Sequence, residues 1–276
     1  MKPARFDYAR PATLAEALAL LAQPEAAVLA GGQSLMPMMN LRVARPALLV
    51  DINRLPGLGE IRLAGGVLRI GALARHAEVL ASPLVAQAAP LLPQALAQVA
   101  HAAIRNRGTL GGSLSLADPA AELPACMLAL DATLVVASAR GERRIPAGAF
   151  FHGLYSTALA ADELLLAAEL PAAAPGWRFA FLEVARRHGD FAMAGVALAL
   201  GPNAARLALC GVEAGQRRQP AAEAALAAGD PAAAIAALAS TDAMDGPDLP
   251  AAQRRHLAQV LLRRALAQLE AADAAA

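Results

Sequence analysis

Cysteine is scarce in this chain, which holds only Cys126 and Cys210, far apart and both in apolar surroundings. There is no Cys-x-x-Cys pair, so the chain cannot by itself supply the four thiolates that hold an iron–sulfur cluster. The surroundings favour the interpretation of both cysteines as small buried side chains.

Long apolar runs are also missing, although 57% of the residues are hydrophobic. Alanine inflates that content, and no run approaches the roughly 18 apolar residues of a membrane-spanning helix. The best candidate, residues 125–137, contains Asp131 and ends in a β-branched segment that is typical of a buried strand. The N-terminal residues lack the apolar core of a secretory signal, so we expect a cytoplasmic protein without membrane insertion.

A large excess of either charge is absent: the chain has 24 Lys and Arg residues and 23 Asp and Glu residues, which gives a net charge of +1. Nothing in this balance favours binding to nucleic acid or to an anionic membrane. The five histidines show no metal-ligand spacing, and no nucleophile elbow is present. The sequence therefore predicts neither a metal site nor a catalytic residue.

What the chain does contain is a pair of glycine-rich turns with hydroxyl side chains. The first turn is Ala30-Gly31-Gly32-Gln33-Ser34-Leu35, and the second is Thr109-Leu110-Gly111-Gly112-Ser113. Glycine lets a backbone come close to a ligand, and successive N–H groups in such a turn can form a concavity that suits a phosphate. Two such turns indicate a ligand with more than one phosphate, or alternatively two tight turns without a ligand.

The residues around the second turn bear on the same question. Neither turn has the Gly-x-Gly-x-x-Gly pattern of a Rossmann site or the Gly-Lys-Ser/Thr end of a P-loop. Arg105 and Arg107 could neutralise a diphosphate, or belong to a solvated surface run. Asp118 and Glu122 could accept hydrogen bonds from ribose-type hydroxyls. Capping of a helix that begins at Pro119 explains Asp118 equally well, whereas helix-dipole compensation explains Glu122 less readily.

Hydrophobic periodicity predicts a mixed α+β protein. A helix over 13–21 has Thr13 as N-cap and Glu16 at the capping-box spacing. The stretch 171–176 is the clearest linker, so we expect a larger domain over 1–173 and a smaller one of sheet and helices over 177–276. The other expected helices are 77–81, 91–102, 221–228, 232–239 and 253–270, and the expected strands and hairpins are 26–30, 48–52, 63–70, 134–146, 163–170, 179–186, 195–200 and 206–210.

In combination, the motifs resemble the FAD-binding medium subunit of the molybdenum hydroxylases, the family of the carbon monoxide dehydrogenase medium subunit and the xanthine dehydrogenase flavin domain. Three segments carry the resemblance: 30–35, 104–113 and 117–124. Further matches run along most of the chain, including Asp51-Ile52-Asn53 and the segment 187–192.

The resemblance implies a vanillyl-alcohol-oxidase (PCMH) type FAD-binding domain of two subdomains, followed by a smaller C-terminal domain. One FAD per chain would place its diphosphate in the two turns. Glu122 would contact the ribityl chain, with Asp118 close by, and the backbone of Leu164 would reach the flavin or adenine side. Residues 190–193 would approach the isoalloxazine ring, where Met193 offers neither a charge nor a strong hydrogen bond.

The resemblance also implies an oxidoreductase subunit that takes electrons from [2Fe–2S] clusters and passes them to an external acceptor. A small iron–sulfur subunit and a large molybdopterin subunit would be its partners, in a dimer of heterotrimers. The alternatives are a stand-alone FAD-dependent oxidoreductase acting on a small substrate and a non-enzymatic nucleotide-binding or assembly protein. Carbon monoxide, aldehydes, purines and N-heterocycles all stay open as substrates, and so does the acceptor.

Overall fold

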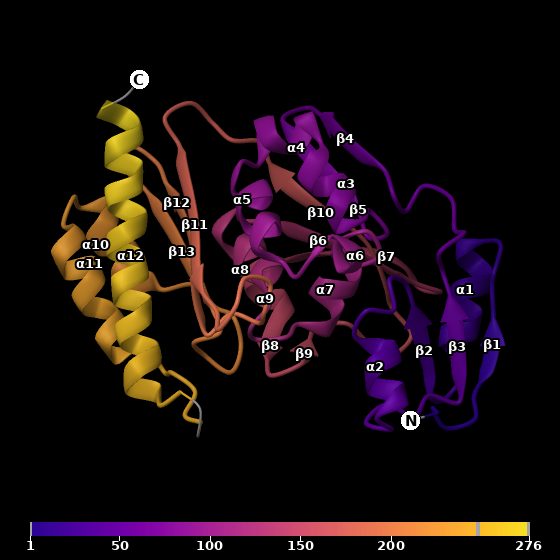
Figure 1. Cartoon of the computed structure of the whole chain (residues 1–276). Helices are drawn as coiled ribbons and strands as arrows, with labels where there is room; N and C mark the ends of the chain where they lie inside the picture. Colours follow the sequence, from indigo (N-terminus) through magenta and orange to yellow (C-terminus); the bar gives the residue numbers. More distant parts are fainter. Residues whose placement is uncertain (1, 247–248, 275–276) are drawn as a thin grey trace.

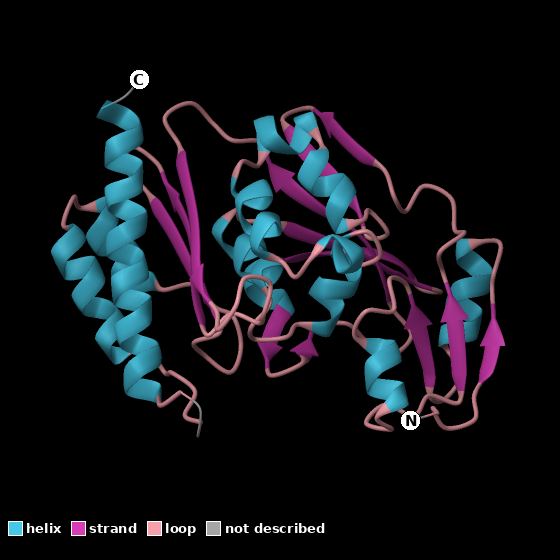
Figure 2. Ribbon diagram, in the orientation of Figure 1, coloured by secondary structure: helices cyan, strands magenta, loops and turns pink. Residues whose placement is uncertain are grey.

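The computed structural model describes residues 2–246 and 249–274 and arranges them in three sheet-containing units (Figure 1). The chain contains both helices and strands, as Figure 2 shows, which confirms the expected α+β class. None of the helices in the described residues combines the length and the hydropathy needed to cross a bilayer.

The N-terminal unit is a three-stranded parallel sheet whose strands are connected by two helices. β1 (Asp7–Ala9) and β2 (Ala26–Leu29) pair on either side of β3 (Leu48–Asp51). In α1 (Leu14–Leu21), Thr13 accepts from the N–H of Glu16, the cap predicted from the spacing. Because β2 and β3 are parallel, the first turn, which follows β2, and Asn53, which follows β3, lie at the same edge of the sheet.

The middle unit is built on a five-stranded antiparallel sheet in the order β4–β5–β10–β6–β7. Its strands are β4 (Ile61–Ala64), β5 (Val67–Gly71), β6 (Thr133–Ser138), β7 (Gly141–Pro146) and β10 (Leu164–Pro171). Both hairpins predicted from the sequence, β4–β5 and β6–β7, are present.

Short helices cover the face of this sheet that looks toward the C-terminal unit (Figure 1). Their apolar faces join the sheet in one large buried core. A small pair of strands follows at the edge, after α9 (Ala147–Phe150): β8 (Phe151–Gly153) and β9 (Ser156–Thr157). The covering helices are α3 (His76–Ala81), α4 (Pro83–Ala88), α5 (Leu91–Gln98), α6 (Ala102–Arg105), α7 (Leu110–Leu116) and α8 (Glu122–Ala129).

The C-terminal unit is an antiparallel sheet between two helix layers. One face of its sheet packs on α5 and α8, and the other packs on helices of its own unit (Figure 1). Residues 172–177, which connect it to β10, form no helix or strand, and the domain boundary there stays a prediction. Its elements are β11 (Arg178–Val184), β12 (Ala194–Leu200), β13 (Ala205–Cys210), α10 (Pro220–Ala227), α11 (Pro231–Ala237), η1 (Leu238–Ser240) and α12 (Ala251–Ala274).

The helix expected over 91–102 is present only over 91–98, because the chain bends between α5 and α6. Ala100 has a φ of +43°, which a right-handed helix excludes. The side chain of Arg105 reaches back from α6 and donates to the carbonyls of Val99 and Ala100. The bend therefore uses the guanidinium that we considered for a diphosphate, whereas the side chain of Arg107 is exposed.

The helix start predicted at Asp118 is also wrong. α8 begins at Glu122 with Ala121 as its N-cap, and Asp118 instead accepts from the N–H of Ala120 through Oδ1. Partners from the C-terminal unit occupy the carbonyls that would start the helix earlier: the Gln216 amide donates to the carbonyl of Asp118, and the N–H of Gly211 donates to that of Pro119. Glu122 lies in the first turn of α8, as expected.

Candidate functional site

The first turn connects β2 to α2 (Leu35–Asn40) and leaves a row of backbone donors unpaired. Gly32 has a φ of +71°, and the Gln33 side chain donates to the carbonyl of Gly31. Among the described residues, the backbone N–H groups of residues 31 to 34 have no hydrogen-bond partner. Consecutive unpaired N–H groups in such a conformation make a concavity that binds anions.

The second turn is built differently, because the N–H groups of residues 110 to 113 are already paired. Leu110 and Gly111 donate to the carbonyls of Ala74 and Ala72, and Gly112 and Ser113 donate to Oγ1 and the carbonyl of Thr109. The hydroxyl of Ser113 has no partner among the described residues. This turn therefore offers a ligand the Ser113 hydroxyl and the exposed surface of Gly112. It does not present a row of free backbone amides like that of the first turn.

The two turns lie against each other. A Cβ atom on Gly31 would overlap the carbonyl oxygen of Arg107, directly before the second turn. At Gly111 it would lie 2.6 Å from the Cβ of Ala72. These two glycines are required for close backbone packing, whereas Gly32 is required for its positive φ.

Ala30, the first residue of the first turn, and Leu164 belong to one apolar cluster. The side chain of Leu164, at the start of β10, is in the apolar cluster on which Ala30 packs. Leu35 begins α2 and is half-buried.

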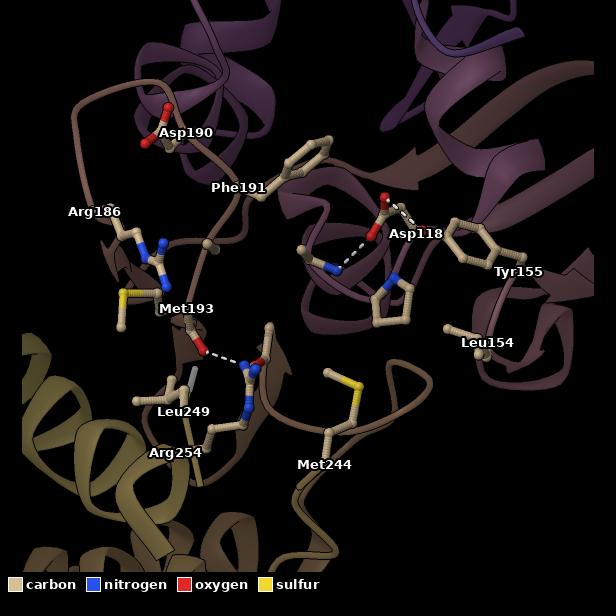
Figure 3. Close-up of a pocket in the computed structure, with 14 residues that line it drawn as sticks. Asp118, Leu154, Tyr155, Arg186, Asp190, Phe191, Met193, Met244, Leu249 and Arg254 are labelled. Carbon is tan, nitrogen blue, oxygen red and sulfur yellow. Dashed lines mark hydrogen bonds between the residues drawn. The ribbon is translucent and has the colours of Figure 1, made fainter. Parts of the chain in front are cut away.

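A separate cavity of about 540 Å³ lies between the middle and C-terminal units (Figure 3). Asp118 is on its wall, where the hydroxyl of Tyr155 donates to its Oδ2 at 3.2 Å. Phe191, in the loop between β11 and β12, is 75% exposed and lines the same cavity. An exposed aromatic ring beside a carboxylate suits a flat, partly polar ligand.

Met193 lines the cavity and is fixed through its backbone. Its N–H donates to the carbonyl of Val184, and its carbonyl accepts from the Arg254 guanidinium at 2.9 Å (Figure 3). Arg254 also donates to the carbonyl of Gly211. The last long helix thereby anchors the end of the loop that carries Phe191.

Glu122 is buried between α8 and the C-terminal sheet instead of lining the cavity. Burial raises its pKa to about 8, and the charges of Glu183 and Asp118 add to this effect. Burial also raises the pKa of Glu183 to about 7, and its Oε2 has no hydrogen-bond partner among the described residues. Both carboxyl groups are therefore neutral over much of the range below pH 7.

Three residues beside the turns were not singled out as site residues from the sequence. Asn53 and Arg75 contact the carbonyls next to the two turns, and His76 lies directly under the second. Asn53 falls in one of the motifs that carry the resemblance, which was an available signal. No sequence signal marked Arg75 and His76, since their hydrogen-bond partners are distant in the chain.

Comparison with known proteins places these features in a family. Residues 4–173 match the FAD binding domain in molybdopterin dehydrogenase. The chain is 45% identical over 220 residues to caffeine dehydrogenase subunit beta of Pseudomonas sp. (strain CBB1), covering 77% of this chain and 75% of the relative.

Two solved structures agree over nearly the whole length. Carbon monoxide dehydrogenase from Hydrogenophaga pseudoflava, in the form that lacks the Mo-pyranopterin moiety of its cofactor, matches with a TM-score of 0.94 and 37% identity. That match covers 98% of this chain and 99% of the other. Quinoline 2-oxidoreductase from Pseudomonas putida 86 matches with a TM-score of 0.91 and 38% identity, covering 98% of each chain.

The fold and the unpaired turn define a nucleotide-binding component of an oxidoreductase. More particularly, the chain belongs to the family of FAD-binding domains of molybdopterin dehydrogenases, which confirms the resemblance found in the sequence. Its cofactor is FAD, and the row of unpaired N–H groups at residues 31–34 fits the diphosphate of that group.

The raised pKa values of the buried Glu122 and the half-buried Glu183 predict a dependence of stability on pH. The pKa values of Glu122 and Glu183 in the folded protein lie above the ordinary value of 4.5, so the folded state favours the neutral carboxyl groups. Their contribution to the free energy of unfolding is therefore fully present below pH 4.5. It is lost as the pH rises through about 7 and 8. Glu122→Gln and Glu183→Gln should flatten the fall in unfolding free energy between pH 5 and 8, by at most roughly 1.4 kcal/mol per pKa unit.

Urea denaturation of the cofactor-free protein at several pH values measures this effect. Glu270→Gln, on the exposed face of α12, is the matched control and should keep the wild-type pH profile. Wild-type pH profiles in both Gln variants would show that these carboxyl groups are charged in the folded protein.

Proposed function

We propose that this chain is the FAD-carrying electron-transfer subunit of a heterotrimeric molybdenum hydroxylase. It takes electrons from [2Fe–2S] clusters on a small partner subunit and passes them to an external acceptor, while a large partner subunit carries the molybdopterin. The observation that carries the proposal is the row of unpaired N–H groups at residues 31–34. The names of the relatives, which are subunits and chains of dehydrogenases, support a complex of this kind.

The residues of this chain bind and orient the cofactor. In this proposal the first turn holds the diphosphate through its N–H groups, and Ser113 adds its hydroxyl. Asp118, Phe191 and Met193 surround the flavin ring in the cavity. Glu122 is buried outside the cavity lining, and its contact with the ribityl chain, like that of the Leu164 backbone with the flavin or adenine side, is carried over from the family resemblance. The bound flavin supplies the redox chemistry, so the protein needs no acid or base of its own.

Purification of the isolated chain tests the cofactor assignment. The protein should be yellow and release one FAD per chain on denaturation, as measured by absorbance. It should not turn over aldehydes, purines or N-heterocycles, since the molybdenum centre belongs to the partner. A colourless protein that takes up no added FAD would contradict the proposal, and substrate turnover by the isolated chain would indicate a stand-alone oxidoreductase.

Retrieval of a tagged chain from its native cells tests the partners. Two further subunits should co-purify in equal amounts, and metal analysis of the complex should find iron and molybdenum. A chain that is retrieved by itself and without these metals would contradict the heterotrimer.

A glycine substitution tests the first turn. Gly32→Val should weaken FAD binding by roughly tenfold or more, because a branched side chain at positive φ displaces the N–H groups of the turn. Titration of the cofactor-free protein with FAD, followed by flavin fluorescence, gives the dissociation constant.

Gly66→Val is the matched control. Gly66 has a φ of +75°, lies in the β4–β5 hairpin, and has open space where a Cβ would be added. Both variants share the cost of a positive φ, about 1–2 kcal/mol, and Gly32→Val adds close contacts with the side chains of Met36 and Leu29. Gly66→Val should bind FAD normally. Equal FAD affinity in both variants would remove the first turn from the diphosphate site.

A further inference from the structure

The two glycine turns belong to different units, so their relative position depends on contacts between those units. The first turn follows β2 of the N-terminal sheet, whereas the second begins α7 in the helix layer of the middle unit. We infer that Asn53, Arg75 and His76 form a bracket that fixes the two turns at the spacing that one diphosphate needs. This inference rests on the proposed function, because it assumes that the turns bind FAD.

Within the bracket, Asn53 makes the contact with the first turn. Its Nδ2 donates to the carbonyl of Ala30 at 2.9 Å and to Oδ1 of Asp51 at 2.6 Å. The backbone N–H of Asn53 donates to the same Asp51 oxygen at 2.9 Å. These contacts fix the orientation of the amide, so its Oδ1 faces away from the turn and is available to a donor.

Arg75 connects Asn53 to the segment directly before the second turn. One guanidinium nitrogen donates to Oδ1 of Asn53 at 2.7 Å, and the other terminal nitrogen donates to the carbonyl of Arg107. The planar guanidinium holds its donors in a fixed fork, so the distance between these two acceptors is set by its shape. The carboxylate of Glu78 accepts from the backbone N–H of Arg75 and holds the residue at the start of α3.

His76 continues the bracket along the second turn. Its backbone N–H donates to the carbonyl of Gly108, and its Nε2 lies 3.0 Å from the carbonyl oxygen of Thr109. Burial lowers the pKa of the ring to about 4, so the ring is neutral at pH 7 and donates from Nε2. Three consecutive carbonyls, of residues 107 to 109, are thereby held by Arg75 and His76.

The bracket matters because other contacts between the units are not directional. Apolar residues of both units share one buried cluster, and hydrophobic contact alone permits small sliding movements. In the described part of the chain, the bond from Arg75 to Asn53 is the one hydrogen bond that joins residues 2–56 to the residues that follow. Hydrogen bonds are directional, so this link can set the register of the two turns.

Arg75→Met and Asn53→Ala test the inference. Each should raise the FAD dissociation constant of the cofactor-free protein by roughly tenfold or more, with far-UV circular dichroism unchanged. Arg75→Lys should restore part of the affinity, since an ammonium reaches one acceptor but not both. The double variant should bind no more weakly than Arg75→Met, because both residues act in one link.

Arg69→Met is the matched control. Arg69 pairs with Glu169 on the middle sheet at 2.6 Å, away from the turns, so its loss should change stability without changing FAD affinity. An equal loss of affinity in Arg69→Met would overturn the inference, and so would wild-type affinity in Arg75→Met or Asn53→Ala.

The result is separable from the proposed function. If the wild-type protein binds no FAD, the proposed function fails. If the wild type binds FAD and Gly32→Val does not, but the bracket variants bind normally, only the bracket is wrong. Should Arg75→Met fail to fold, Arg75→Lys and Asn53→Ala decide the question, because both keep most of the local packing.

Discussion

The proposed diphosphate site depends on four backbone N–H groups, of residues 31 to 34, that the described part of the fold leaves without partners. Gly31 is buried and Gly32 and Gln33 are half-buried, and such backbone donors are costly to leave unpaired unless a ligand or water supplies acceptors. The row exists because β2 ends at Leu29 and Gly32 then takes a positive φ that turns the chain away from the sheet. A diphosphate offers several oxygens to such a row, which connects the backbone geometry to the cofactor of the family.

Local signals in the sequence were sufficient to locate the two turns and most of the strands. Paired glycines, the Thr13 cap and the Gly65-Gly66 hairpin all act through neighbours in the chain, so their sequence pattern predicts them. The different use of the two turns was not predictable in this way. The partners of the second turn, Ala72 and Ala74, come from a distant segment, and only the fold brings them into reach.

Asp118 shows how tertiary contacts override a local preference. An Asp-Pro pair is a favourable helix start, and the local pattern predicts one there. In the folded protein, Gln216 and Gly211 donate to the carbonyls of Asp118 and Pro119, so the helix begins only at Glu122. The displaced carboxylate of Asp118 instead faces the cavity, where it meets Tyr155.

The same cavity contains Met193, whose side chain offers neither a charge nor a strong hydrogen bond. Methionine offers no charge, but its contacts with Val184 and Arg254 are made by the backbone, so the thioether is not needed to hold the loop. Two residues earlier, Phe191 presents an exposed aromatic ring to the same space (Figure 3). Because α12 anchors the end of this loop through Arg254, the C-terminal unit restricts the position of the Phe191 ring. In the proposed function the aromatic contact to the flavin thus comes from Phe191, and Met193 supplies only polarisable apolar surface beside it.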